Sequence, residues 1–288
     1  MVAILGVLVT LVMVFGGYAL AGGKLAIILH ALPFEMMIIG GAAVGAFVAG
    51  NNFDVVKRTG ADLLVIFKGP RYHKQDYQDL LCLLHNLIEL GAKDPLELER
   101  AIEDPETSPV FEAYPKIKSD HEACDIICDT LRSLMMNFDN AFQVEELLEK
   151  QLAHLKEESL AGAHALHRTA DALPALGIVA AVLGVIKTMA SIDKPPEILG
   201  QMIGSALVGT FLGVFLAYGI VGPFAERVKQ IREEEQTFYN LIREVLVHSL
   251  HRHPPSMCVE VGRRNAPGKV RPSFLELEDA IRAQKKAA

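Results

Sequence analysis

Four windows of the sequence are dominated by apolar residues and carry almost no charge, at residues 2–23, 36–53, 172–186 and 198–225. A helix rises about 1.5 Å per residue, so about 20 apolar residues cross a hydrocarbon core of about 30 Å. The fourth window, with 28 residues, exceeds that length. The third has 15 uncharged residues and reaches across only if the Lys187 side chain extends toward an interface. The pattern predicts four membrane-spanning helices surrounded by lipid.

The first window also allows a second interpretation, because Ala19-Leu20-Ala21 resembles a signal-peptidase site. A secretory signal begins with a positively charged region and continues with a short apolar run. Here no Lys or Arg precedes the run, and the run is too long. We therefore expect a retained span.

Apolar residues also recur at helical spacing outside the four windows, as in amphipathic helices. No stretch alternates apolar and polar residues as a half-buried strand would. The sequence therefore predicts an all-α membrane protein with a large helical domain between spans two and three. One stripe comprises Leu80, Leu83, Leu84, Leu87 and Ile88, and a second, in a helix expected over 144–160, comprises Val144, Leu147, Leu148, Leu152 and Leu155.

The polar segments contain residues that are typical of the starts and ends of helices. The Asp94-Pro95 pair is typical of an N-cap followed by a first-turn proline. Beyond the fourth window we expect one helix to continue to about His248, before a break at Pro254-Pro255. A last helix is predicted by the capping box Ser273-x-x-Glu276.

Composition and charge narrow the class of protein. Hydrophobic residues make up 51% of the 288 residues, and the formal charge is −7. Residues 54–171 hold 13 Lys plus Arg and 23 Asp plus Glu, a net charge of −10, which argues against a nucleic-acid partner. The expected parts are helices one and two in 1–53, a cytoplasmic helical domain in 54–171, helices three and four in 172–225, and a cytoplasmic helical region in 226–288.

Basic residues set the expected orientation, because they accumulate on the cytoplasmic side of membrane proteins. The two short loops hold only Lys24 and Lys194, whereas nine basic residues flank the windows on the other side. Both termini and the long loop between spans two and three are therefore expected in the cytoplasm. The nine residues are Lys57, Arg58, Lys68, Arg71, Lys74, Arg168, Arg227, Lys229 and Arg232.

No residue pattern indicates catalysis, a cofactor or a metal. Cys124 and Cys128 are four residues apart, which is not CxxC spacing, and buried free thiols are the favoured interpretation of the four cysteines. The histidines cluster at 164–167 and 248–253 without a matching set of further ligands. A glycine-rich phosphate loop and a nucleophile elbow are absent from the sequence, so an enzyme is not expected.

Small residues recur every four positions in the last two windows. Such stripes let helix backbones approach closely, and they favour packing either between helices of one subunit or between subunits. They comprise Gly177 with Ala181, Ala180 with Gly184, and Ser205, Gly209, Gly213 and Ala217.

The segment "DALPALGIVAAVLGVIKTMASIDKPPEILGQMIGSALVGTFLGVFLAYGIVGPFAERVKQ" resembles spans three and four of the MotA family of flagellar motor stator proteins. The likeness runs from "VFGGYALAGG" to "RPSFLELEDAIRAQKK", almost the whole chain. The resemblance implies four spans and five copies around two copies of MotB, whose single span carries an aspartate and which grips peptidoglycan. It further implies a proton-driven torque generator that pushes on the rotor protein FliG.

The resemblance also implies roles for residues of the ion path. Spans three and four contain no carboxylate, and Glu35 is expected near the outer edge of its segment, so the carboxylate of the path must come from MotB. Gly177, Ala181, Thr210 and Tyr218 would line that path. Sodium-driven relatives carry a threonine at the position of Ala181. Because alanine lacks that hydroxyl, the resemblance implies H⁺ rather than Na⁺ as the coupling ion. No cofactor is expected.

Two further sets of residues carry over from the family. Pro174 and Pro223 would be hinges that couple the channel to the cytoplasmic domain; the alternative is that they mark helix ends. Glu99, flanked by Arg100 and Glu103, would contact FliG; the alternative is an ordinary solvated helix surface. The basic residue expected eight positions before Glu99 is Gly91 here, which makes Lys93 a candidate replacement.

Two other functions compete with the stator. An energiser of the ExbB and TolQ type drives an outer-membrane system with a similar proton channel, but is expected to have three spans. A scaffold or transporter without proton coupling is the third candidate. Membrane labelling of the termini and co-purification of an aspartate-bearing partner distinguish these functions.

Overall fold

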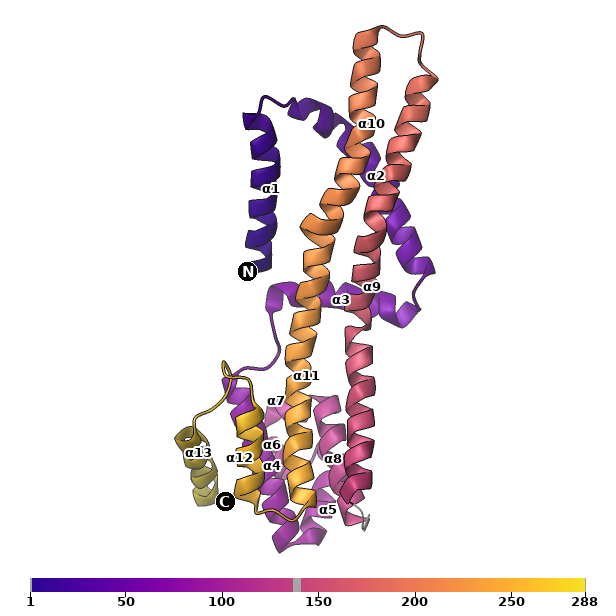
Figure 1. Ribbon diagram of the computed structural model, residues 1–288. Helices are drawn as coiled ribbons and strands as arrows, with labels where there is room; N and C mark the ends of the chain where they lie inside the picture. Colours follow the sequence, from indigo (N-terminus) through magenta and orange to yellow (C-terminus); the bar gives the residue numbers. More distant parts are fainter. Residues whose placement is uncertain (1, 137–140, 288) are drawn as a thin grey trace. The chain divides into compact units, whose positions relative to one another are not determined.

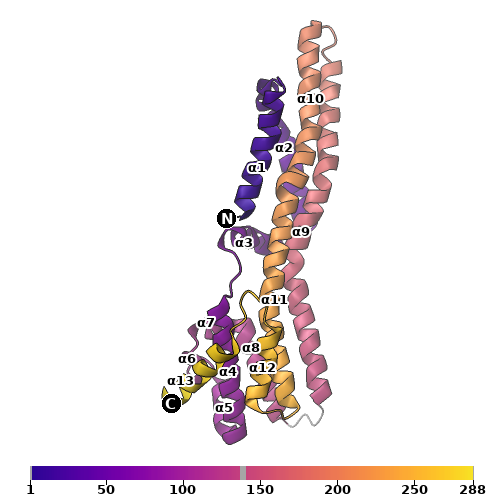
Figure 2. The same ribbon diagram turned by 60° about the vertical axis from the view of Figure 1, so that its left-hand side comes forward.

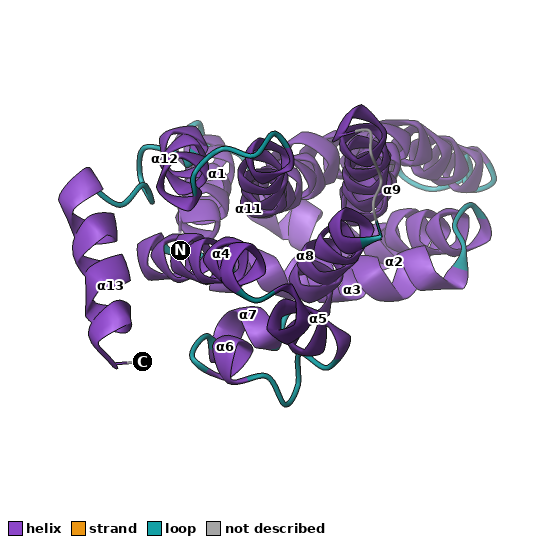
Figure 3. Cartoon of the chain, turned by 90° about the horizontal axis from the view of Figure 1, so that it is seen from below, coloured by secondary structure: helices purple, strands orange, loops and turns teal. Residues whose placement is uncertain are grey.

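The computed structural model describes residues 2–136 and 141–287, and every regular element in those residues is a helix (Figures 1 and 3). The expectation of an all-α protein is therefore confirmed for the described residues. The elements are α1 (Val2–Leu20), α2 (Leu25–Ala49), α3 (Phe53–Lys68), α4 (Lys74–Lys93), α5 (Pro95–Glu103), α6 (Pro109–Glu112), α7 (Pro115–Lys118), α8 (His121–Met135), α9 (Ala141–Met189), α10 (Pro196–Leu216), the π-helical turn η1 (Ala217–Val221), α11 (Gly222–Leu250), α12 (Pro255–Asn265) and α13 (Phe274–Ala287).

The chain divides into two compact units, and neither is one continuous segment. The first unit comprises residues 1–69 and 159–231, and the second comprises residues 70–158 and 232–288. Helices α9 and α11 each supply residues to both units.

The first unit contains the apolar helices. Four helical stretches among the described residues have the length and composition needed to cross a membrane, as predicted: Ala3–Leu20, Leu25–Ala49, Ala141–Met189 and Pro196–Leu250. Helices α9 and α10 run side by side in this unit (Figures 1 and 2). Ile39 of α2, Ala180 of α9 and Leu212 of α10 are buried together.

Two predicted boundaries in the first unit were wrong. Helix α2 begins at Leu25 rather than Met36 and continues through Pro33 and Glu35, because the Glu35 side chain is buried by packing and does not end the helix. The helix expected over 144–160 and the third span form one helix, α9, of 49 residues.

The second unit has its own apolar core, built around α4. The stripe from Leu80 to Ile88 is buried as predicted, and α12 and α13 pack on α4 (Figure 3). Of the second stripe, Val144, Leu148 and Leu152 are buried. The inclusion of Leu147 was wrong: its side chain is 54% exposed, because it lies outside the narrow arc of α9 that faces the core.

The predicted caps are confirmed, because they depend on neighbouring residues alone. The Asp94 carboxylate accepts hydrogen bonds from the backbone N–H groups of Leu96 and Glu97, both at 3.1 Å. Ser273 N–H donates to Glu276 Oε2 at 2.6 Å, and Glu276 N–H donates to Ser273 Oγ at 3.2 Å. Helix α11 ends at Leu250, close to the expected His248.

The four cysteines are free and buried, as expected. Burial raises the pKa of the Cys82 and Cys128 thiols to about 12. These thiols are therefore protonated and unreactive at neutral pH.

Candidate functional site

Helices α9 and α10 pack backbone against backbone at glycines of the small-residue stripes. A Cβ atom added to Gly213 would lie 2.6 Å from the carbonyl oxygen of Leu173, and one added to Gly177 would lie 2.8 Å from that of Gly209. Such distances exclude any side chain unless the helices move apart. The prediction that these stripes pack helices within one subunit is confirmed at these positions.

Ala181 and Thr210 lie at the same level of this helix pair. A Cβ atom on Gly209, the neighbour of Thr210, would lie 3.1 Å from the backbone nitrogen of Ala181. Both Ala181 and Thr210 are half-buried. The Thr188 hydroxyl, about two turns after Ala181 on α9, donates to the carbonyl oxygen of Gly184 at 2.9 Å.

The other two residues expected on the ion path have different surroundings. Gly177 is buried beneath the backbone of α10. Tyr218 lies in η1 and is 71% exposed. It borders a pocket of about 520 Å³ together with Thr10 of α1 and Pro223 and Arg227 of α11.

Both prolines lie inside long helical stretches. Pro174 is within α9, and Pro223 is the second residue of α11, directly after η1. The interpretation that they mark helix ends was wrong, because the helix continues past each of them. At Pro223 the continuation uses a π-helical turn, in which the Gly222 N–H donates to the carbonyl oxygen of Ala217, five residues earlier.

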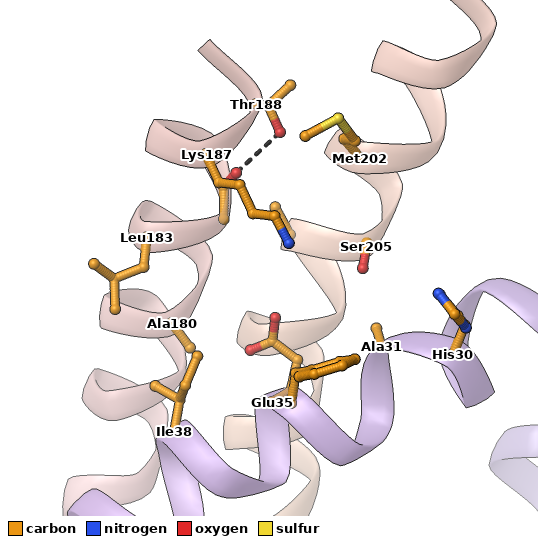
Figure 4. Close-up of a pocket in the computed structure, with 13 residues that line it drawn as sticks. His30, Ala31, Glu35, Ile38, Ala180, Leu183, Lys187, Thr188, Met202 and Ser205 are labelled. Atoms are coloured by element: carbon orange, nitrogen blue, oxygen red, sulfur yellow. Dashed lines mark hydrogen bonds between the residues drawn. The ribbon is translucent and has the colours of Figure 1, made fainter. Parts of the chain in front are cut away.

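Glu35 does not lie at the edge of its helix, as the sequence suggested. It is 7% exposed, and a Cβ atom on Gly209 of α10 would lie 2.7 Å from its Oε2 atom. Figure 4 shows its carboxyl group directed from α2 toward α9 and α10. The expectation that Glu35 lies near the outer edge of its segment was wrong. The distribution of charge along the sequence does not show which helix covers a side chain.

The residues expected at the rotor contact lie at the end of α4 and in α5, in the second unit. Glu99, Arg100 and Glu103 are exposed on α5. Lys93, the last residue of α4, pairs with Glu89 at 2.9 Å. All four residues are exposed and belong to the second unit.

Gly91 has a packing reason to differ from the family pattern. A Cβ atom at Gly91 would lie 2.8 Å from Cδ2 of Leu98, which is buried between α4 and α5. A larger side chain there would require Leu98 to shift. Lys93 instead presents its charge at the exposed end of α4.

The sequence did not identify two polar features. In the first unit, Thr59 and Asp62 of α3 are buried, and Gly162 of α9 leaves the space for the Asp62 carboxylate. In the second unit, Tyr72 donates a hydrogen bond to buried Asp120, and its hydroxyl lies 3.1 Å from that of Tyr239. The spacing of apolar residues in α3 could have predicted that helix. No sequence pattern, however, indicates the contacts that bury Asp62 and Asp120.

No group of three or more His, Cys, Asp or Glu side chains in the described residues is arranged to hold a metal ion.

Two protein families match the chain. The motility protein A N-terminal family matches residues 4–95, and the MotA/TolQ/ExbB proton channel family matches residues 119–240. Motility protein A of Salmonella typhimurium is 39% identical over 284 residues, covering 98% of this chain and 96% of the relative. That of Escherichia coli is 39% identical over 286 residues, covering 99% and 96%.

The fold is similar to that of a solved relative. The structure of MotAB from C. jejuni superposes with a TM-score of 0.71 at 20% identity, covering 94% of this chain and 98% of that chain. The near-complete match to motility protein A is the stronger evidence, because it combines substantial identity with full coverage of both chains. The chain belongs to the motility protein A family, within the MotA/TolQ/ExbB proton channel family.

Proposed function

We propose that this chain is the ion-conducting stator subunit of a bacterial flagellar motor, which couples proton flow to torque. The observation that carries the proposal is the 39% identity to motility protein A over nearly the full length of both proteins. The four helices of spanning length and the tight α9–α10 pair provide a wall for an ion path. The family is one of channels and not of enzymes, which accords with the lack of a catalytic pattern.

The proposed partner is a protein of the MotB type, with a single span that carries an aspartate. The solved relatives of similar fold are MotAB complexes, and windows 172–186 and 198–225 of this chain contain no carboxylate. We propose five copies of the chain around two MotB copies in the inner membrane, with both termini in the cytoplasm. Residues 54–171 and 226–288 would then form cytoplasmic parts, and FliG would be the rotor contact.

The match of residues 4–95 to the motility protein A N-terminal family favours a stator over an ExbB or TolQ energiser. Co-expression with MotB in a strain that lacks its own stators tests the proposal. We expect restored swimming and co-purification of the two chains. A stably inserted chain that neither restores swimming nor binds MotB would contradict the proposal.

The proposed coupling ion is H⁺, because Ala181 offers no side-chain oxygen beside Thr210. A sodium ion leaving water needs several oxygen ligands, whereas a proton needs only a carboxylate and a water. Swimming speed at fixed pH should therefore stay constant across a sodium series and collapse when an uncoupler removes the proton gradient. Speed that rises with sodium and survives the uncoupler would overturn this assignment.

A further inference from the structure

A pocket of about 320 Å³ opens between α2, α9 and α10 in the first unit. The Glu35 side chain lines it, and its Oε2 atom is buried without a hydrogen-bond partner among the described residues. In Figure 4 the carboxyl group points into the space between the three helices. A carboxylate 93% buried on apolar helices is therefore directed into a cavity with room for several water molecules.

Few other polar groups face this carboxylate. Helix α2 contributes His30, α9 contributes Lys187 and Thr188, and α10 contributes Ser205. The Thr188 hydroxyl already donates to the Gly184 carbonyl oxygen, which leaves His30, Lys187 and Ser205 to interact with water in the pocket. Figure 4 shows the Lys187 side chain extending toward the space between Glu35 and Ser205.

Packing alone does not account for a carboxylate at this position. Burying an unpaired carboxylate costs several kcal/mol more than burying a neutral group of similar shape, so an amide would fill the space at lower cost. Ionisable side chains within membrane helices usually serve transport for this reason. An amide cannot alternate between a charged and a neutral form, whereas a carboxyl group does so by losing and gaining a proton.

We propose that Glu35 is a proton-exchanging carboxylate of this subunit, which takes up and releases protons through water in the pocket. The proposal rests on the proton-driven function above and adds a second carboxylate to the one that MotB supplies. The Glu35 carboxylate accepts a proton from a hydronium ion, which becomes a water molecule. The neutral carboxyl group then donates that proton to another water molecule or to the MotB carboxylate, which restores the anion.

The neighbouring groups fit both states of this exchange. The Lys187 ammonium offsets the negative charge when Glu35 is ionised, since attraction between charges is stronger in a pocket of low polarity than in bulk water. When Glu35 is protonated, the carboxyl O–H can donate to water. Ser205 can hold that water, because a hydroxyl both donates and accepts hydrogen bonds.

The test compares Glu35→Gln, Glu35→Asp and the matched control Glu197→Gln in the complex with MotB. Glu197 lies on α10, is exposed and does not line the pocket. Proton uptake by vesicles containing the purified complex, swimming speed and the melting temperature are measured for each variant. We expect Glu35→Gln to lower proton flux about tenfold or more, since positioned acid–base groups contribute at least that much to proton transfer.

The melting temperature separates proton exchange from a structural role. We expect it to be unchanged or higher in Glu35→Gln, because a buried amide costs less than a buried carboxylate. Glu35→Asp should retain most of the flux, and Glu197→Gln all of it. Normal flux in Glu35→Gln, equal losses in the Gln and Asp variants, or loss of assembly in Glu35→Gln would each overturn the proposal.

The result for the unmodified chain distinguishes failure of the proposed stator function from failure of the proposed role of Glu35. If the unmodified complex conducts protons and restores swimming while Glu35→Gln behaves identically, the stator function stands and the role of Glu35 fails. If the unmodified complex shows neither activity, the stator function itself fails, and with it the role of Glu35.

Discussion

Glu260 of α12 is held in its ionised form by two arginines one turn along the helix. Arg263 donates to both carboxylate oxygens, from Nε at 2.7 Å and from a terminal nitrogen at 2.8 Å, and Arg264 Nε donates at 2.8 Å. The hydrogen bonds from Arg263 are the main cause that lowers the pKa of Glu260 from 4.5 to about 2. Because protonation would weaken these bonds, the ion pair links stability to pH.

Glu260→Gln should lower the melting temperature by an amount that depends on pH. A carboxyl group whose pKa is lower in the folded state stabilises that state above its unfolded pKa, and the effect is lost as the pH falls through the folded pKa. The destabilisation should thus be constant above about pH 5, at about 1 kcal/mol for a partly exposed pair. It should shrink from about pH 4.5 toward pH 2.

Thermal unfolding of the purified complex at several pH values measures this effect. Glu278→Gln is the matched control, because Glu278 pairs with Arg282 at an exposed position of α13. Its removal should change stability by about 0.5 kcal/mol or less. A loss in Glu260→Gln that is the same at every pH would show that the charge is not responsible.

Local chemistry determined which single residues the sequence could place. The Asp94 cap and the Ser273–Glu276 capping box involve groups within three residues of each other, so the sequence alone identifies them. The burial of Glu35 depends on α10, about 170 residues later in the chain. No pattern around Glu35 reports that contact.

At the scale of elements, the approach of α9 and α10 depends on the absence of side chains. Gly213→Ala would place a Cβ atom 2.6 Å from the Leu173 carbonyl oxygen and 2.8 Å from the Gly177 Cα. Both are backbone atoms, so the helices must separate, at a cost of about 1–3 kcal/mol. We expect a lower melting temperature and less co-purified MotB.

Gly200→Ala is the control on the same helix, because a Cβ atom at Gly200 meets nothing within 4 Å. Its stability should equal or exceed that of the unmodified chain, since alanine favours helix more than glycine. Equal behaviour of the two variants would contradict close packing at Gly213.

The π-helical turn η1 keeps one buried face continuous through the long helical stretch. Ala217, Ala225 and Val228 are all fully buried. Eight residues of regular α-helix would rotate Ala225 about 80° away from Ala217, at about 100° per residue. A π-helical turn contains about one additional residue, so the two positions return to nearly the same face.

Pro174 and Pro223 are predicted to act as hinges of these stretches. Proline lacks an N–H and clashes with the carbonyl four residues earlier, so each helix is weakened at a point inside it. Pro174→Ala and Pro223→Ala should each leave membrane insertion intact and abolish swimming. Expression, membrane fractionation and a swimming assay measure the outcome, and normal swimming by both variants would exclude the hinge role.

Among the elements, the sequence predicted apolar helices better than the boundaries between helices. Windows of uncharged residues identify spans, because charges in hydrocarbon are costly. The same rule ended the second span at Phe53 and missed α3, whose Lys57 and Arg58 were interpreted only as flanking charges. The rule also failed to predict the full length of α9, because a polar helix can continue directly into an apolar one without a break.

At the scale of the whole molecule, the surface at the α4–α5 junction is predicted to contact FliG. Glu99→Lys alone should reduce swimming speed only modestly, since exposed charge pairs are individually weak and screened by salt. Combined reversal of Glu99 and Lys93 should reduce it further. Swimming speed at two salt concentrations measures both variants.

Glu112→Lys makes the same charge change at an exposed position of α6 and serves as control. It should leave speed unchanged, with melting temperatures compared to verify that all variants fold. Unchanged swimming after reversal of both Glu99 and Lys93 would count against this surface.

The division into two discontinuous units has a consequence for the order of events during synthesis. The core of the second unit combines Leu80 and Leu84 with Phe238, Ile242 and Val245. Residues 70–158 therefore leave the ribosome before the residues that complete their core. At about 5–20 residues per second, the synthesis of residues 159–231 takes several seconds, during which this core is incomplete. A nascent chain that stops before residue 232 leaves this apolar surface uncovered, so truncated products should be recognised by chaperones and proteases, and the motor subunit matures only after its last spanning helix has been synthesised.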